Sequence, residues 1–212
     1  MRAEASFNSS RVASEELSVQ FGEFCKFTDG LVLDVGSGRN KAPYLSRCGR
    51  PVALDPLVPE NRDFEFVRGV GEFLPFRIGV FAGSVTATTL DHCMKPSLVL
   101  REMRRVTMPD GRICIWIGLH DKILRPPKPV WTLSKGWRRL VSGDLAYIAR
   151  AIYVRYIARY LKTQTDPFHL HHFQSTDIAA LLDTAGLTLV EEKLLPDGSL
   201  FLSAKCQETN AL

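Results

Sequence analysis

The sequence predicts a single α/β domain with a doubly wound, mostly parallel sheet. Between residues 31 and 117, short apolar runs alternate with segments of helical periodicity, and this alternation is typical of repeated strand–helix–strand units. The first run ends in an acid and is followed at once by Gly36 and Gly38. These glycines indicate a buried strand that enters a tight turn and leaves room for a ligand to approach the backbone. Near the C-terminus, Asp197-Gly198 is a hairpin signal and predicts a terminal antiparallel pair.

Composition places the chain among ordinary globular proteins. The 212 residues are 45% hydrophobic and 24% charged, which is enough to bury one core, so we expect one domain over residues 1–212. The net charge of +4 is compatible with an anionic partner but does not require nucleic acid. The five cysteines are scattered, without a Cys-x-x-Cys pair, which disfavours a disulfide scaffold and predicts a reducing, cytoplasmic location. No apolar run is long enough to cross a bilayer, so only peripheral membrane contact stays open.

The first half of the chain should hold five strands and their connecting helices. A loose segment over residues 1–12 precedes a helix that Ser14 caps and whose apolar face includes Phe21 and Phe24. Strands are then predicted over residues 31–35, 51–54, 64–67, 84–90 and 112–117, with a short helix that ends near Leu45 and a longer helix opened by Pro96.

Regular structure resumes after residue 172. Ser175 or Thr176 caps a helix that Gly186 ends. Strands over residues 187–190 and 200–202 flank the hairpin turn. These two strands bring the expected sheet to seven.

Residues 120–172 interrupt the pattern as an insertion after the fifth strand. A proline-rich connector leads to a helix over residues 144–161 with an apolar stripe and an adjacent basic edge. One interpretation is a lid over a substrate site, in which Trp131, Tyr156 and Arg159 contact an anionic or lipid-linked molecule. The alternative is a helix that packs on the sheet and exposes its charged edge to solvent.

Two acidic residues at neighbouring strand ends carry the functional argument. Asp34 ends the first strand and Asp55 ends the second. In a strand–helix–strand unit, an acid about 20 residues beyond the glycine turn binds ribose hydroxyls. Because ligands of open α/β sheets bind beyond the carboxyl ends of the strands, both carboxylates should face one crevice. The pattern therefore predicts a ligand that contains a nucleoside.

The glycine turn indicates which nucleoside this is. A dinucleotide fingerprint needs a third glycine so that a helix N-terminus can hold a pyrophosphate, but Lys41 stands at that position. Asp34 would also repel a diphosphate, whereas it suits a ligand that carries positive charge and no phosphate. S-adenosylmethionine (SAM), with its sulfonium and amino groups, fits this description.

Several motifs in order resemble those of the class I SAM-dependent methyltransferases, in particular the methyltransferase type 11 subgroup. They occupy residues 33–38, 54–55, 71–76, 90–92, 101–106 and 109–111. The resemblance implies a Rossmann-like seven-stranded sheet with a helical insertion after strand five, and SAM as the cofactor. It also leaves two roles for the N-terminal helix, which either covers the cofactor pocket or packs outside the sheet.

The resemblance assigns cofactor contacts to particular positions. The expected cofactor-binding residues are Asp34, Gly36, Ser37, Gly38, Asp55, Pro56, Val70, Gly71, Glu72, Leu90 and Asp91. In this scheme the glycine loop surrounds the methionine moiety, Asp55 binds the ribose, and Gly71 and Glu72 flank the adenine. Val70 departs from the pattern, because many members carry an adenine-binding aspartate there, and Ala82 and Asp110 are further departures.

His92 is the candidate catalytic base. It follows the predicted end of strand four, where acceptor and sulfonium should meet, and imidazole titrates near neutral pH. The alternative is a histidine that packs against or caps the next turn. A second group, His169, His171 and His172, suggests substrate contacts through His169 and His172 more than a metal site, because no fourth ligand has clear spacing.

These observations predict a SAM-dependent methyltransferase that acts on O, N or C of a small or lipid- or sugar-linked metabolite. No recognised RNA-binding module accompanies the basic insertion, which argues against nucleic acid as the acceptor. Three alternatives stay open: an RNA (tRNA) methyltransferase, a non-catalytic partner subunit with the same fold, and a nicotinamide-dependent dehydrogenase.

Overall fold

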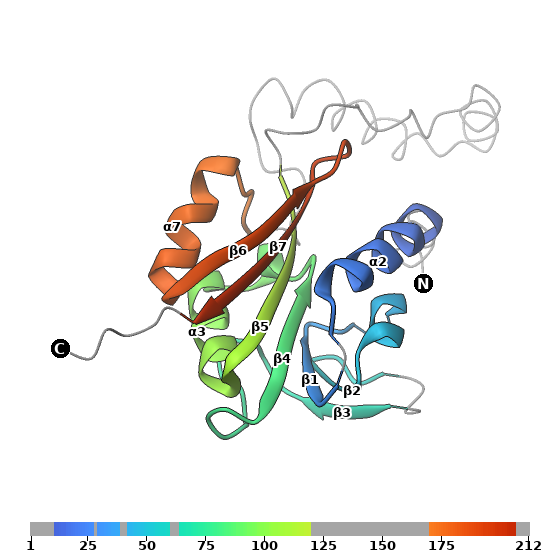
Figure 1. Ribbon diagram of the computed structural model, residues 1–212, viewed down its shortest axis with the longest axis vertical. Helices are drawn as coiled ribbons and strands as arrows, with labels where there is room; N and C mark the ends of the chain where they lie inside the picture. Colours follow the sequence, from blue (N-terminus) through green and yellow to red (C-terminus); the bar gives the residue numbers. More distant parts are fainter. Residues whose placement is uncertain (1–10, 28, 39–41, 60–63, 120–169, 207–212) are drawn as a thin grey trace, which may run out of the picture.

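A seven-stranded sheet forms the centre of the fold (Figure 1). The computed structural model describes residues 11–27, 29–38, 42–59, 64–119 and 170–206. The strands are β1 (Leu31–Val35), β2 (Arg50–Asp55), β3 (Glu65–Arg68), β4 (Phe81–Ala87), β5 (Thr107–Gly118), β6 (Leu187–Leu194) and β7 (Ser199–Cys206). Their order is β3-β2-β1-β4-β5-β7-β6; β1 to β5 pair in parallel, and β7 is antiparallel to both neighbours. The predicted fold class is confirmed.

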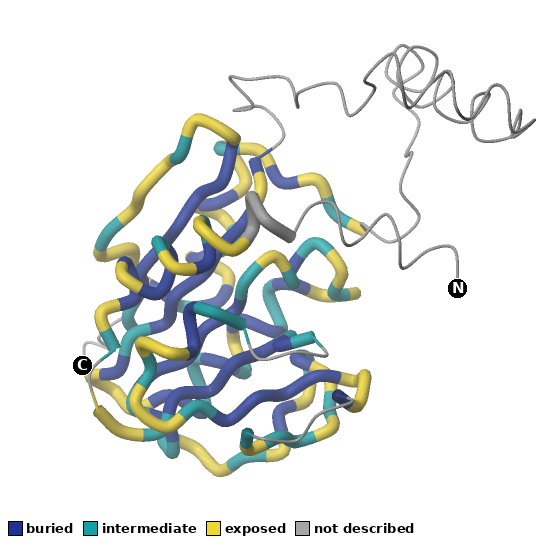
Figure 2. Tube along the Cα trace, turned by 90° about the vertical axis from the view of Figure 1, so that its right-hand side faces the viewer, coloured by how far each residue is buried: buried dark blue, intermediate teal, exposed yellow. Residues whose placement is uncertain are grey.

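Helices cover both faces of this sheet and divide the core into two layers. Helices α3 (Pro96–Val106) and α7 (Ser175–Ala185) pack on one face, over a layer that includes Leu33 and Val35. Helix α2 (Arg11–Cys25) and the 3-10 helix η1 (Pro43–Arg47) contact each other on the opposite face. In that second layer the ring of Phe21 lies 5.0 Å from that of Phe201. Figure 2 shows that buried residues run through the middle of the described part of the chain and that exposed residues lie toward its outside.

Several predicted element boundaries were wrong. Strand β5 begins at Thr107 and not at residue 112, and β6 ends at Leu194 and not at residue 190. Helix α2 begins by Arg11, so Ser14 lies inside the helix; no proline or glycine among residues 11–13 interrupts a helical backbone there. Gln174 is the N-cap of helix α7, and its backbone N–H donates to the Asp177 carboxylate (2.8 Å). Neither Ser175 nor Thr176 is therefore the cap.

The end of β4 also differs from the prediction. The strand ends at Ala87, because Thr88 has a left-handed φ of +49°, and residues Leu90–His92 form the 3-10 helix η2. This conformation is costly for a β-branched residue. By contrast, the predicted stop at Gly186 is confirmed, since its φ of +68° ends α7.

The predicted insertion lies largely outside the described residues, as do its candidate substrate residues Trp131, Tyr156, Arg159 and His169. Residues 1–10 of the predicted loose segment are outside them as well. Among the helices that are described, none combines the length and the apolar character that crossing a bilayer requires.

The turn after β1 is held against the end of β4. Gly36 has a φ of +79°, and a Cβ added there would collide with the side chain of Thr89. The Thr89 hydroxyl donates to the carbonyl oxygen of Gly36 (3.2 Å). The sequence suggested that this glycine lets a ligand approach the backbone. In the structure, the packing of Thr89 against it already excludes a larger side chain. Gly38, with a φ of +70°, faces open space instead.

Gly36→Ala should therefore lower the free energy of unfolding far more than Gly38→Ala. The left-handed backbone costs alanine about 1 kcal/mol at each position. Only alanine at position 36 would also collide with Thr89, and we expect a further loss of roughly 2 kcal/mol from this overpacking. Urea denaturation of the two variants measures the difference, and equal losses would contradict the tight packing of Thr89 on the turn.

Candidate functional site

Asp34 and Asp55 lie at the carboxyl ends of adjacent strands and on the same face of the sheet. The register pairs Asp34 with Ala53, and Asp55 follows Ala53 by two residues, so the three side chains share a face. Both aspartates are buried. The charge of Asp55 contributes to raising the pKa of Asp34, which means that the two carboxylates lie close enough to interact. The structure thus brings together the two residues that the sequence singled out.

Asp34 is held by one hydrogen bond. The hydroxyl of Tyr44, in η1, donates to Oδ1 (2.8 Å), whereas Oδ2 is buried and has no hydrogen-bond partner among the described residues. Burial raises the pKa of Asp34 from 3.8 to about 7, the Tyr44 hydrogen bond lowers it, and Asp55 raises it. A buried acceptor with spare capacity suits a cationic or hydrogen-bond-donating group. The sequence did not predict Tyr44 as a partner, and no local spacing connects it to Asp34.

Asp55 joins the ends of two loops. Its Oδ2 accepts from the amide of Gly38 (2.9 Å), and its Oδ1 accepts from the amide of Leu57 (2.8 Å). The amides of Gly36 and Ser37 donate to the carbonyl oxygen of Leu54 (2.8 and 3.3 Å). The amides of the glycine loop are therefore directed at the end of β2, so they do not form an anion-binding cradle. This agrees with a ligand that has no phosphate.

The residues at this edge of the sheet fit SAM. A Cβ added at Gly38 would meet nothing within 4 Å, so the loop has open space beside it. Each Asp55 oxygen accepts one amide and retains a second lone pair for a ribose hydroxyl. The unpartnered Asp34 oxygen adds negative charge at the same edge, which suits a sulfonium or an ammonium group.

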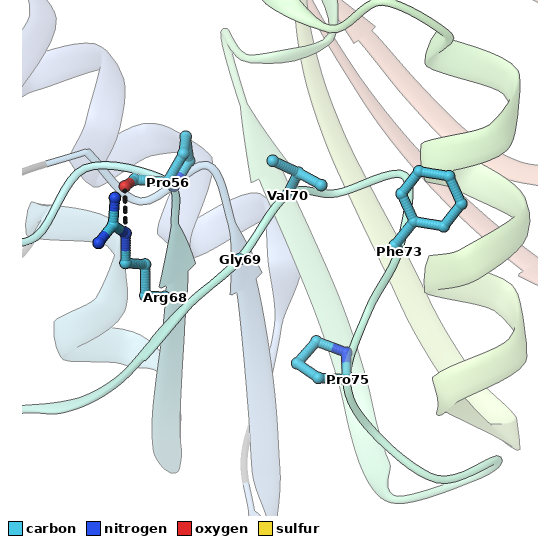
Figure 3. Close-up of a pocket in the computed structure, with 6 residues that line it drawn as sticks. All are labelled: Pro56, Arg68, Gly69, Val70, Phe73 and Pro75. Carbon is cyan, nitrogen blue, oxygen red and sulfur yellow. Dashed lines mark hydrogen bonds between the residues drawn. The ribbon is translucent and has the colours of Figure 1, made fainter.

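A cavity of about 470 Å³ opens beside Asp55 (Figure 3). Its lining comes from the last residue of β3 and from the loops that follow β2 and β3, and consists of Pro56, Arg68, Gly69, Val70, Phe73 and Pro75. Pro56 and Val70 belong to the predicted cofactor set; the other four were not predicted as contacts, although Phe73 and Pro75 fall inside one of the quoted motifs. In Figure 3 the Arg68 side chain runs alongside Pro56, and its Nε donates to the Pro56 carbonyl oxygen (3.2 Å).

Gly71 and Glu72 do not line this cavity. A Cβ at Gly71 would lie 2.9 Å from Val99, so this glycine is required for packing against α3. The Glu72 carboxylate accepts from the amides of Met94 (2.9 Å) and Lys95 (3.3 Å). These amides directly precede α3, whose N-terminus attracts negative charge. Glu72 thus caps α3 from a neighbouring loop.

A second contact with α3 holds the same loop further along. Glu102 accepts from the amide of Leu74 (2.9 Å), and Arg105 donates to the carbonyl oxygens of Leu74 and Phe76 (both 2.9 Å). Glu102 and Arg105 also form an ion pair (2.7 Å), and the Arg105 hydrogen bond lowers the pKa of Glu102. The loop over residues 69–76, which supplies most of the cavity wall, is therefore anchored at two points on one helix.

The η2 turn places Leu90, Asp91 and His92 beyond β4. Leu90 is buried, Asp91 is half-buried and His92 is exposed. The Nε2 of His92 lies 3.9 Å from Oδ1 of Asp91. His92 is thus accessible at the strand end where the sequence predicted methyl transfer.

The segment at residues 170–171 is bound to this turn. The amides of Leu170 and His171 donate to the carbonyl oxygen of Asp91 (2.7 and 3.1 Å), and the His171 ring lies 3.0 Å from the carbonyl oxygen of Cys93. His172, next in the chain, is exposed. Among the described residues, no group of three His, Cys, Asp or Glu side chains is arranged to hold a metal ion.

Comparison with known proteins supports the predicted family. Residues 33–115 match the family model described as "Methyltransferase domain". A demethylmenaquinone methyltransferase from Paenarthrobacter aurescens is 28% identical over an alignment of 208 residues, which covers 88% of this chain and 76% of that protein.

Solved methyltransferases share the fold at low sequence identity. A 1,6-didemethyltoxoflavin-N1-methyltransferase from Burkholderia thailandensis, with bound 1,6-didemethyltoxoflavin and S-adenosylhomocysteine (SAH), has a TM-score of 0.62 and 18% identity; the match covers 96% of this chain and 87% of that one. The complex between the Trm112 methyltransferase activator and a putative methyltransferase of Haloferax volcanii matches with a TM-score of 0.64 and 12% identity, over 100% of this chain and 97% of that one. The predicted fold is found, and the predicted family motifs all lie within the residues that the family model matches, so the prediction of a class I SAM-dependent methyltransferase with SAM as its cofactor is confirmed.

Proposed function

We propose that the glycine loop, Asp55 and the cavity between the ends of β2 and β3 form the SAM site. The observation that carries this placement is the position of Asp55, which binds the amide of Gly38 on one side and immediately precedes Pro56 of the cavity wall on the other. In this arrangement the ribose lies at Asp55, the base lies in the cavity, and the methionine moiety lies near Gly38 and Asp34. Leu90 and Asp91 of η2 border the transfer site.

The main chemical task of the protein is to align the acceptor with the methyl group of SAM. Bound SAM supplies an electrophilic methyl group on sulfur. The side chains of the site hold the acceptor in line with that group and exclude water. His92 is proposed as the base that takes up the proton which the acceptor loses when it gains the methyl group. Its exposed position at the end of β4 supports this role.

The proposed acceptor is a small or lipid- or sugar-linked metabolite that is methylated on O, N or C. Phe73 and Met94 are 74% and 80% exposed, and Glu72 joins the two loops that carry them. Phe73 also lines the cavity. An exposed apolar pair beside the cofactor site favours an acceptor with an apolar part. The Paenarthrobacter relative, a demethylmenaquinone methyltransferase by name, supports the same class.

Asp55→Asn should weaken SAH binding by at least tenfold. Hydrogen bonds to a charged group contribute about 1.5–3 kcal/mol each, and the new amide would also face the N–H of Gly38. Isothermal titration calorimetry with SAH measures the change. Glu65→Gln, which removes the same charge from exposed β3, is the matched control and should bind normally. An unchanged affinity in folded Asp55→Asn would contradict the placement of the ribose.

SAM binding should tighten as the pH rises from 6 to 8. With a pKa of about 7, the ionised fraction of Asp34 grows from about one tenth to about nine tenths over this range. The same raised pKa means that the folded chain retains the Asp34 proton to a higher pH than the unfolded chain does. The free energy of unfolding of the ligand-free protein should therefore fall as the pH rises from about 4 to about 7.

The Asp34→Asn variant, whose side chain still accepts the hydrogen bond from Tyr44, is the test of both predictions. Its SAM affinity and its free energy of unfolding should each change less with pH. If the variant and the original protein show the same pH profiles, Asp34 is not the group that titrates.

Reduced demethylmenaquinone is the first acceptor to assay, with unmodified tRNA as the competing candidate. We expect SAH release with this or another small acceptor and none with tRNA, and the opposite result would overturn the metabolite proposal.

Once an acceptor is known, His92→Gln should lower kcat by roughly 100-fold or more, as expected for the loss of a general base. The Kd for SAH should stay unchanged, and an unaltered kcat would remove His92 from the reaction.

A further inference from the structure

The cavity beside Asp55 has apolar walls. Pro56, Val70, Phe73 and Pro75 surround it, and Arg68 is the one charged side chain among the six residues that the structure places around it (Figure 3). None of the six has a carboxylate, amide or hydroxyl side chain. Because a guanidinium has donors and no acceptor, the lining side chains provide nothing that could accept a hydrogen bond.

Two backbone carbonyls of this wall already have donors. The Pro56 oxygen accepts from Arg68 (3.2 Å), and the Val70 oxygen accepts from the amide of Phe73 (3.2 Å). Two carboxylates lie nearby, but neither is among the six residues of the wall. Asp55 binds two amides, and Glu72 is directed at the start of α3. Among the described residues, the wall therefore offers a base no side-chain acceptor.

We infer that this cavity holds the base of the cofactor by apolar contact and does not select the exocyclic amine of adenine, with Val70 as the residue that sets this tolerance. The inference rests on the proposed SAM site. The amine of adenine is a hydrogen-bond donor, so a site that selects it must supply an acceptor. Val70 is 43% exposed and lies on the cavity wall, where a carboxylate would reach a bound base. Hypoxanthine, with a carbonyl in place of the amine, meets no repelling acceptor and faces the donors of Arg68.

Calorimetry with SAH and with S-inosylhomocysteine, in which hypoxanthine replaces adenine, tests this inference. The two dissociation constants of the original protein should agree within about fivefold. Val70→Asp should then bind SAH at least tenfold more tightly than the inosine analogue, as expected for one added hydrogen bond to a charged group. Val58→Asp is the matched control, since Val58 is 40% exposed and does not line the cavity. It should leave the ratio unchanged.

The outcomes separate this inference from the proposed site. If SAH binds and the inosine analogue binds more than thirtyfold more weakly, the tolerance is overturned while the SAM site stands. If folded Val70→Asp shows the same ratio as the original protein, Val70 does not set the tolerance. If neither compound binds, the inference and the proposed site are both overturned. Melting curves of the ligand-free variants confirm that each is folded.

Discussion

The parallel pairing of β1 with β2 is the constraint on which the rest of the site depends. Its register places Asp34 and Asp55 at one edge and on one face of the sheet. A shift of one residue would turn one carboxylate into the opposite layer, where Leu33 and Leu54 lie. The same strand end also holds the glycine loop, through the carbonyl oxygen of Leu54 and the carboxylate of Asp55. The same contacts therefore stabilise the fold and shape the site.

This sharing explains the chemical character of the site. In a dinucleotide-binding turn, free amides at a helix N-terminus hold phosphate. Here the amides of Gly36, Ser37 and Gly38 are bonded to β2, and the charge left near the loop is negative. Burial keeps the pKa of Asp34 near neutrality, so its charge responds to its surroundings within the physiological range. A cationic ligand that donates hydrogen bonds fits such an edge better than an anion does.

Helix α3 is the second support of the site. Glu72 and Glu102 accept from loop amides, and Arg105 donates to loop carbonyls. These polar contacts hold the backbone of the cavity wall, and they leave the side chains of Val70 and Phe73 exposed. The apolar character of the cavity is thus compatible with a well-anchored loop, because the groups that anchor it are directed away from the cavity.

The amino-acid sequence by itself determined the fold class, the terminal hairpin and the two acids at the strand ends. These features follow from local patterns, because strand periodicity, a glycine turn and an Asp-Gly hairpin each involve a few neighbouring residues. Only the tertiary structure decided that Tyr44 binds Asp34, that Thr89 packs on Gly36, and that Glu72 caps α3 and does not line the cavity. Each of these contacts joins side chains or loops brought together by the alignment of separate strands and helices, and no spacing along the chain encodes that alignment.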